Sequence, residues 1–356
     1  MGSSRSVRWA CPRSLVWLPG YYMNLFELTR KLIDIPSVTG DEQAVGEFLE
    51  AHLKSLGYQV EMQEVAEDRF NVIATTETPP RVVFSTHMDT VPPYIISSED
   101  NERIYGRGAC DAKGIIAAQI FAAQRLRGEG INSIGLLFTV DEETGSLGAQ
   151  VANQKKLAQP PRYLINGEPT DNQLARATKG SLRLTLKTSG RAAHSAYPEQ
   201  GDSAIEKLLD ILDRIRSANW PADEILGETT CNIGLINGGT RPNVIPASAE
   251  AVLQLRLVSE VGAVKTIIET AVDGGAEVEY LSEHDPVHLV TVEGLEQCVV
   301  RFTTDIPYLS QWGAPLLLGP GSILNAHTDH ESVEKQELSD AVELYVQLVR
   351  TLLESG

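Results

Sequence analysis

Five short segments of the chain each carry one or two side chains that metal ions favour as ligands. In chain order they read STHMDTVP, GRGACDAKG, DEETGS, NGEPT and NAHTDHE. Histidine and carboxylate groups without a cysteine ligand suit a pair of zinc or similar divalent ions. Two ions held about 3.5–4 Å apart can activate a water molecule and polarise a carbonyl group at once. The segments together indicate a two-metal hydrolase, with candidate groups on His87, Asp89, Asp111, Glu142, Glu143, Glu168 and His327.

The spacing of His87 and Asp89 favours a metal ligand supported by a carboxylate. Residues i and i+2 at the end of a strand point the same way, so the aspartate can accept the second N–H of the imidazole. A capping aspartate beside a surface histidine is the alternative for this pair alone. The preceding strand, the following Thr-Val-Pro and the other four segments favour the metal site.

The other acidic positions also have structural alternatives. Asp111 follows a glycine-rich turn and could cap the helix that begins near Ile115, or bridge two cations with its two oxygens. The doublet Glu142 and Glu143 ends a hydrophobic strand, where neighbouring like charges are costly unless a cation compensates them. One glutamate of the doublet can bind metal while the other moves protons. Glu168, before a proline, is a turn residue if taken alone.

The histidines other than His87 divide into the candidate ligand His327, a nearby decoy and several residues without an assigned role. His330 is a second candidate three residues after His327. We expect His52, His284 and His288 to be surface residues, because the first lies on a polar helix face and the others flank a predicted domain boundary.

Alternating strands and helices must position these groups. Apolar residues at helical spacing predict helices at 25–33, 45–53 and 115–126, and buried strands are predicted at 81–85, 134–140 and 163–166. This order predicts an α/β fold with a mainly parallel sheet covered by helices on both faces. The candidate ligands follow the strands, and ligands of such sheets bind beyond the carboxyl ends of the strands.

A smaller domain interrupts this pattern. Residues 177–285 read strand–helix–strand–strand–helix–strand, which predicts a two-layer α+β, ferredoxin-like unit. The chain then divides into an extension of no structural role at 1–22, a first catalytic part at 23–176, the inserted domain at 177–285 and a second catalytic part at 286–356.

Composition restricts the partners and the compartment. The net charge of −18 argues against nucleic acid, whose phosphates require a basic surface. The 4 cysteines are scattered without close pairing, which favours reduced thiols and a cytoplasmic protein. No apolar run approaches the roughly 20 residues of a membrane span.

Seven ordered motifs resemble those of a known enzyme family. They are HxDTVP, YGRGxxDxKG, EExGS, GEPT, AAHSxxP, NVIP and AHxxxE, and the likeness runs from about Asn24 to the C-terminus. The family is that of the dinuclear zinc deacylases and exopeptidases, typified by acetylornithine deacetylase, succinyl-diaminopimelate desuccinylase and carboxypeptidase G. The resemblance implies two divalent metal ions per chain, zinc in the first place, with cobalt or manganese as substitutes.

The resemblance also implies roles for individual residues. Asp111 would bridge the metals, with His87 and Glu168 completing one site and Glu143 and His327 the other. Glu142 would be the general base and Asp89 the partner of His87. His194, in the inserted domain, would reach the partner subunit of a homodimer and steady the oxyanion. Substrate binding would involve Asn243, Arg256, Gly319 and Gly321.

The expected activity is removal of the acyl group from a small N-acyl amino acid, first of all acetylornithine-type deacetylation. Desuccinylation and carboxypeptidase or dipeptidase action on short peptides remain open. A non-catalytic metal-binding homologue is disfavoured because Glu142 is retained, and a purely structural site needs no free base. The Ala-Ala-His-Ser segment in the inserted domain disfavours an aminopeptidase of a related two-metal architecture.

Overall fold

A six-stranded sheet forms the centre of the larger part of the molecule. The computed structural model describes residues 23–354, so the predicted extension at 1–22 lies outside the described residues. The strands follow the order β1 (Gln59–Ala66), β2 (Arg69–Thr75), β6 (Ile134–Thr139), β3 (Val82–His87), β7 (Tyr163–Asn166) and β17 (Ala314–Leu317).

The sheet is mainly parallel, as predicted. Strands β6, β3, β7 and β17 pair in parallel, whereas β2 is antiparallel to both of its neighbours, β1 and β6. Only Glu67 and Asp68 connect β1 to β2, which is too short for the crossover that a parallel pair needs. Asp68 adopts a left-handed φ of 56° in this turn.

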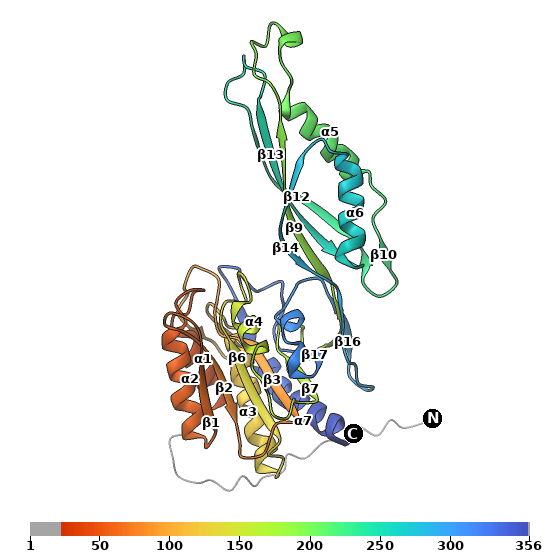
Figure 1. Cartoon of the computed structure of the whole chain (residues 1–356). Helices are drawn as coiled ribbons and strands as arrows, with labels where there is room; N and C mark the ends of the chain where they lie inside the picture. The colour runs from red at the N-terminus through yellow and green to blue at the C-terminus, as the bar shows by residue number, and fades with distance from the viewer. Residues whose placement is uncertain (1–22, 355–356) are drawn as a thin grey trace, which may run out of the picture.

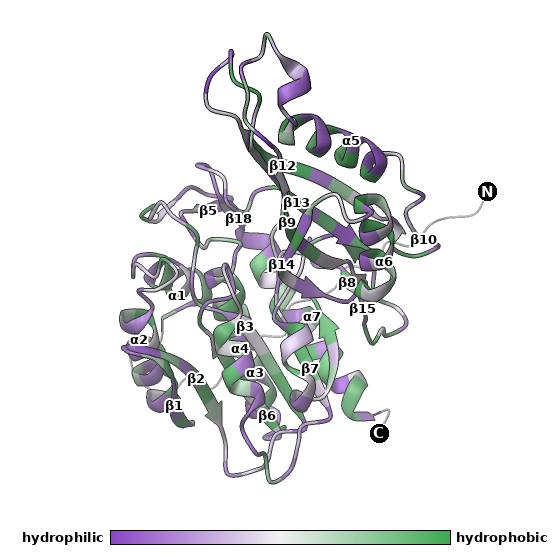
Figure 2. Cartoon of the chain, turned by 45° about the horizontal axis from the view of Figure 1, so that its top comes forward, coloured by the Kyte–Doolittle hydropathy of each residue, from purple (hydrophilic) through white to green (hydrophobic). Residues whose placement is uncertain are grey.

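Helices cover both faces of the sheet, because alternate strand residues pack to opposite sides. Phe84 packs in one cluster with residues of α1 (Leu25–Ile33), α2 (Gln43–Ser55), α3 (Lys113–Gly128) and α7 (Lys335–Glu354). Its neighbour Val83 packs on the other face with α4 (Leu147–Asn153) and Trp312. Figure 2 shows strand β6 mostly in hydrophobic colours, whereas the edge strand β1 and the covering helices are of mixed character.

The inserted domain is a four-stranded antiparallel sheet with two helices on one face (Figure 1). Its elements are β9 (Gly180–Ser189), α5 (Ala204–Arg216), β12 (Thr230–Gly238), β13 (Ser248–Leu257), α6 (Val261–Val272) and β14 (Glu277–His284). The strand order β12-β13-β9-β14 is that of a ferredoxin-like unit, which confirms the predicted class. Leu182, Leu184 and Leu186 of β9 pack against both helices, and none of the helices within residues 23–354 covers the opposite face of the sheet.

Two adjacent strands connect the inserted domain to the larger part. Strand β8 (Leu174–Thr178) leads into β9, and β14 leads into β15 (Val287–His288), which pairs with β8. We propose that the inserted domain spans 177–285, since its sheet begins and ends within these limits. Short elements complete the described chain: β4 (Ser98–Glu99), β5 (Arg103–Tyr105), β10 (Ala222–Asp223), β11 (Gly227–Glu228), β16 (Gln297–Val300), β18 (Ser332–Glu334) and 3-10 turns at Pro198–Gln200, Ile306–Tyr308 and Ser310–Trp312.

Within residues 23–354, no helix has the combined length and apolar character needed to cross a bilayer.

Candidate metal centre

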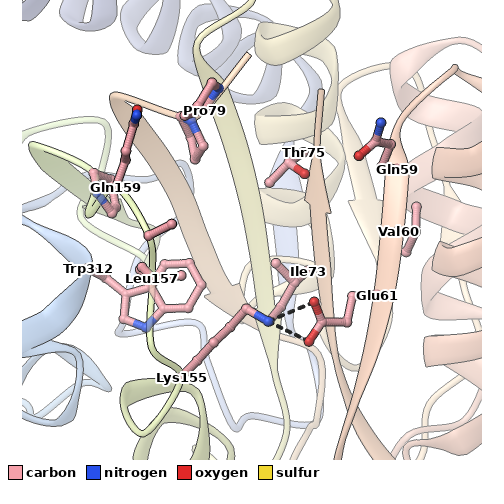
Figure 3. Close-up of a pocket in the computed structure, with 13 residues that line it drawn as sticks. Gln59, Val60, Glu61, Ile73, Thr75, Pro79, Lys155, Leu157, Gln159 and Trp312 are labelled. Atoms are coloured by element: carbon pink, nitrogen blue, oxygen red, sulfur yellow. Dashed lines mark hydrogen bonds and ion pairs between the residues drawn. The ribbon is translucent and has the colours of Figure 1, made fainter. Parts of the chain in front are cut away.

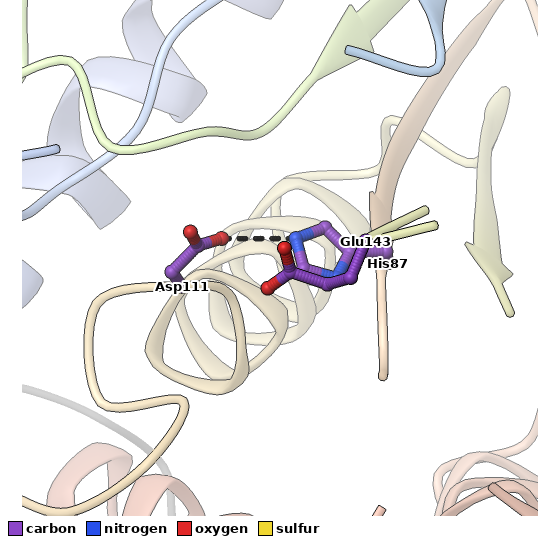
Figure 4. A group of neighbouring side chains, drawn as sticks. All are labelled: His87, Asp111 and Glu143. Carbon is purple, nitrogen blue, oxygen red and sulfur yellow. Dashed lines mark hydrogen bonds and ion pairs between the residues drawn. The ribbon is translucent and has the colours of Figure 1, made fainter. Parts of the chain in front are cut away.

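Asp111 lies between two histidines at the carboxyl end of the central sheet. Its Oδ1 is 2.9 Å from Nε2 of His87, and its Oδ2 is 3.3 Å from Nε2 of His327. The ligand atoms of His87, Asp111 and Glu143 all lie within 4.8 Å of one another (Figure 4). One carboxylate therefore offers a separate oxygen to each histidine, which is the arrangement that a bridging ligand requires.

Each histidine has a further carboxylate beside it. Nε2 of His327 is 3.0 Å from Oε2 of Glu143, and Nε2 of His87 is 3.9 Å from Oε2 of Glu168. The five residues thus form two groups, His87 with Glu168 and His327 with Glu143, which share Asp111. The alternative histidine, His330, is exposed and takes no part in the described hydrogen bonds of the centre.

Strand ends and tight turns bring these groups together. His87 is the last residue of β3, and Glu168 follows β7. The glutamate doublet follows β6 through Asp141, whose φ is 71°. Arg69 holds this turn, because its Nη2 donates to Asp141 Oδ1 at 2.9 Å while the same guanidinium binds buried Glu42 at 2.6 and 2.7 Å.

Asp89 fixes both His87 and the glutamate doublet. Nδ1 of His87 lies 3.0 Å from the backbone oxygen of Asp89 and 3.4 Å from its carboxylate, so Nε2 is free to face the centre. The Asp89 carboxylate accepts the backbone N–H groups of Glu142 and Glu143, both at 3.2 Å, and the hydroxyl of Thr39 at 2.8 Å. Asp89 therefore positions ligands from two different strands.

Glu331 supports the loop of Asp111, a role that sequence reasoning missed. One oxygen of this buried carboxylate accepts the backbone N–H groups of Gly108, Cys110 and Asp111 at 2.9–3.2 Å. Its other oxygen accepts a hydrogen bond of 2.8 Å from buried Arg107. The glutamate ends the AHxxxE motif, so its position was a signal, but only the fold shows which loop it contacts.

The two glutamates of the doublet differ in their contacts. The carboxylate of Glu143 interacts with His327, whereas that of Glu142 has no hydrogen bond or ion pair with another described residue. Burial raises the pKa of Glu142 well above its usual range, and the negative charge of Glu168 raises it further. A raised pKa favours the uptake and release of a proton by this carboxyl group, as a general base and acid requires.

The donor set fits divalent metal ions. Oε1 of Glu168 is buried and has no hydrogen-bond partner among residues 23–354, which is costly unless a cation faces it. Hydrogen bonds to Asp111 and Glu143 raise the pKa of His327 to about 10. A proton on this imidazole thus supplies, without metal, part of the positive charge that the carboxylates attract.

A cavity of about 710 Å³ connects the metal centre with the inserted domain. Its walls carry ligands of the centre on one side and Ser181, Arg183, Gln254 and Arg256 on the other. His284 also lines this cavity, and its Nε2 is 3.1 Å from the hydroxyl of Tyr308. The expectation that His284 is a plain surface residue is therefore wrong, because the 3-10 turn Ile306–Tyr308 packs against the end of β14.

Two expected site residues lie far from this cavity. His194 and Asn243 are exposed in neighbouring loops at the outer end of the inserted domain, where His194 pairs with Val244 in an isolated bridge. Neither lines the cavity at the metal centre of the same chain. Figure 1 shows these loops at the end of the inserted domain that points away from the central sheet.

The glycines after β17 have a packing role. A Cβ atom on Gly319 would come within 2.4 Å of the backbone oxygen of Glu168. A Cβ atom on Gly321, whose φ is 84°, would come within 2.5 Å of Cys110 Cβ. Both glycines thus let the chain pass close to ligand-bearing segments, and neither lines the cavity.

A second cavity, of about 460 Å³, lies at the opposite end of the sheet (Figure 3). Pro80 and Pro161, which precede β3 and β7, contribute to its walls, and Lys155 binds Glu61 at 2.6 Å across it. Its lining contains no histidine or cysteine, so it offers no comparable donor set.

Comparison with known proteins identifies the family. Residues 83–351 match the model of "Peptidase family M20/M25/M40", which is well over half of the 356 residues. The chain belongs to this family. Members are metal-dependent hydrolases, in agreement with the resemblance drawn from the motifs.

Relatives of the M20 family cover almost the whole chain. A Schizosaccharomyces pombe protein named for its peptidase M20 domain is 37% identical over 338 residues, covering 92% of this chain and 84% of the relative. An Aspergillus terreus protein named "Probable carboxypeptidase" is 38% identical over 369 residues, covering 91% of this chain and 85% of the relative.

Solved M20-type structures share the fold. A tripeptidase from Staphylococcus aureus has a TM-score of 0.76 at 22% identity and covers 90% of this chain and 96% of its own. An M20 family metallo-carboxypeptidase from Sulfolobus solfataricus has a TM-score of 0.72 at 17% identity and covers 91% of this chain and 98% of its own. These matches confirm the α/β architecture with an inserted second domain.

We expect the protein to bind two metal ions per chain, because Asp111 faces both histidine–carboxylate groups. Elemental analysis after loading with zinc and removal of free metal should approach a ratio of two. Asp111→Ala should lower the ratio below one, whereas Asp329→Ala, an exposed acid two residues after His327, should leave it unchanged. Saturation of the unaltered protein at one metal with full activity would contradict the bridging role.

Proposed function

We propose that the protein hydrolyses an amide bond and releases an amino acid from the carboxyl end of a short peptide. The observation that carries this proposal is the free Glu142 carboxylate in a cavity that also contains Arg256. Glu142 is suited to moving a proton, and the Arg256 guanidinium is suited to binding a free carboxylate. Several relatives are named as probable carboxypeptidases, which supports cleavage of the last peptide bond and release of the last amino acid.

His87, Asp111, Glu143, Glu168 and His327 would hold two metal ions, for which zinc is the first choice and cobalt or manganese are substitutes. When bound, the metals supply an activated water molecule and a polarising charge for the carbonyl oxygen. Glu142 accepts the proton of the attacking water and later donates it to the leaving amine. Arg256 holds the carboxylate of the amino acid that leaves.

Deacylation of an N-acyl amino acid is the second candidate. It breaks the same type of bond, and the Gly-Ala-Cys-Asp-Ala-Lys segment at 108–113 favours an acetylornithine deacetylase-like enzyme. A substrate panel separates the two activities. Dipeptides and tripeptides should be cleaved at their last bond with kcat/KM at least tenfold above that for N-acetylornithine and N-succinyl-diaminopimelate. The reverse order would make deacylation the activity.

We also propose a reducing, cytoplasmic compartment. Cys110, Cys231 and Cys298 are free thiols, as expected for proteins in such a compartment.

We further propose that the protein is a homodimer in which His194 serves the partner subunit. The support is its distance from the metal centre of its own chain, together with the AAHSxxP motif that carries it. Asn243 lies in the adjacent loop, since its backbone oxygen accepts the N–H of Ser195 at 3.0 Å. Both residues would therefore approach the partner's site together.

Mixing two inactive variants tests this arrangement. His194→Ala and Glu142→Ala should each be inactive alone, and activity should return when their subunits exchange. In a mixed dimer, the site of the His194→Ala chain keeps Glu142 and receives an intact histidine from the other chain. That site should work, while the second site lacks both groups. Demonstrated subunit exchange without recovered activity would assign His194 to its own chain or to no catalytic role.

A further inference from the structure

We propose that Arg183 and Arg256 form an arginine pair that selects substrates with a second carboxylate in the leaving amino acid, namely C-terminal glutamate or aspartate. This inference rests on the proposed function and adds the substrate class. Arg256 would bind the α-carboxylate, and Arg183 would bind the side-chain carboxylate.

The register of the sheet in the inserted domain places the two arginines near each other. In the pairing of β9 with β13, Arg183 lies opposite Gln254, and Ser181 lies opposite Arg256. The arginines are thus diagonal neighbours, which face the same side of a sheet about 7–8 Å apart. That side is the one without helices, because the alternate residues of both strands pack against α5 and α6. Both arginines line the cavity beside the metal centre.

A short network of polar groups fixes the position of Arg183. Its Nε donates to Oε1 of Gln254 at 3.0 Å, and Nε2 of Gln254 donates to the Ser181 hydroxyl at 2.8 Å. The bond through Nε leaves the terminal N–H groups of the guanidinium free for a ligand. A guanidinium held in this way can bind a carboxylate with two parallel hydrogen bonds.

Neither arginine is neutralised within the described chain. The residues paired with Arg183 are Gln254 and Ser282, and those paired with Arg256 are Ser181 and Thr230, so all four are uncharged. Among residues 23–354, no carboxylate forms an ion pair with either guanidinium. Glu283, which also lines the cavity, pairs with Lys265 instead.

The two positive charges also repel each other. Burial lowers the pKa of Arg256, and the charge of Arg183 lowers it further. The acidic groups on the opposite wall are Glu142 and the proposed metal ligands Asp111, Glu143 and Glu168. The two divalent ions would balance the charge of the ligands. A substrate with one carboxylate would leave one guanidinium unpaired, whereas a substrate with two would satisfy both.

Matched substrates that differ in one charge test the proposal. Alanyl-glutamate is compared with alanyl-glutamine, and N-acetylglutamate with N-acetylglutamine, in the unaltered protein, Arg183→Gln and Lys187→Gln. Lys187 is the control because it lies on the same strand and face but pairs with Glu279 at 2.6 Å outside the cavity. Binding of the same four compounds to Glu142→Ala is measured by calorimetry.

We expect the unaltered protein to favour the glutamate member in kcat/KM by about 10- to 100-fold, the effect of a charge-assisted hydrogen bond. Arg183→Gln should lose most of this preference for the glutamate member, and Lys187→Gln should retain it. An equal or higher kcat/KM for the glutamine members, or a ratio unchanged in Arg183→Gln, overturns the proposal. A third outcome is that no compound of either panel is hydrolysed, while the glutamate compounds bind more tightly than the glutamine compounds in a manner that depends on Arg183. The proposed hydrolysis would then be wrong, and the proposed role of the arginine pair in binding would be retained.

Discussion

Replacing Glu142 with alanine is expected to lower kcat by about 10²- to 10⁴-fold, the usual contribution of a general acid–base group. The reason is that its carboxylate is the one in the doublet without a described partner, while its pKa is raised by burial and by Glu168. Metal content should be unaffected, because Glu142 is not among the groups around Asp111. Steady-state kinetics and elemental analysis on the same preparation measure both effects.

Glu143→Ala provides the matched comparison, since it removes the neighbouring carboxylate on the same turn. This variant should lose metal together with activity, because Glu143 contacts His327. Near-normal turnover in Glu142→Ala, or loss of metal from it, would show that the roles within the doublet are reversed.

Replacing Glu331 with glutamine should destabilise the metal-free protein by about 3–5 kcal/mol, the cost of leaving a buried charge unpaired. The side chains of Arg107 and Glu331 are 1% and 0% exposed, so water cannot replace the lost carboxylate. An amide retains one oxygen for the three backbone N–H groups, but its NH₂ cannot accept from Arg107. Urea unfolding followed by circular dichroism measures the change.

The control is Glu334→Gln, three residues away. Glu334 binds Arg103 at the surface, where the side chains are 49% and 35% exposed. Exposed ion pairs contribute about 0–1 kcal/mol, so the free energy of unfolding of this variant should be close to that of the unaltered protein. Equal destabilisation of both variants would remove the special role of Glu331.

Much of the centre could be predicted because its residues lie at strand ends within short motifs. His87, the glutamate doublet and Glu168 follow three predicted strands that prove to be neighbours, so their meeting follows from the topology. The metal-binding role of Asp111 could be predicted only from the family resemblance, because a role as helix cap explained its position equally well. In the structure, the N-cap residue of α3 is Ala112 and not Asp111.

The missed residues reach the site through tertiary contacts between distant segments. Glu331 meets Asp111 across 220 positions of the chain, and Arg183 enters the cavity only because the inserted domain turns its uncovered face to the centre. Strand β17 was not predicted either. It has only four residues, one of them Pro315, and it forms because β7 offers a parallel edge.

The distribution of the ligands along the chain has a consequence for biosynthesis. His87 and His327 are separated by 240 residues (327 − 87), with the whole inserted domain between them. At about 5–20 residues per second, a ribosome needs roughly 12–48 s to pass from the first histidine to the second. During this interval the nascent chain carries Asp111 and Glu143 without the imidazole that faces both. The second half of the centre can therefore acquire its ion only after His327 has been synthesised.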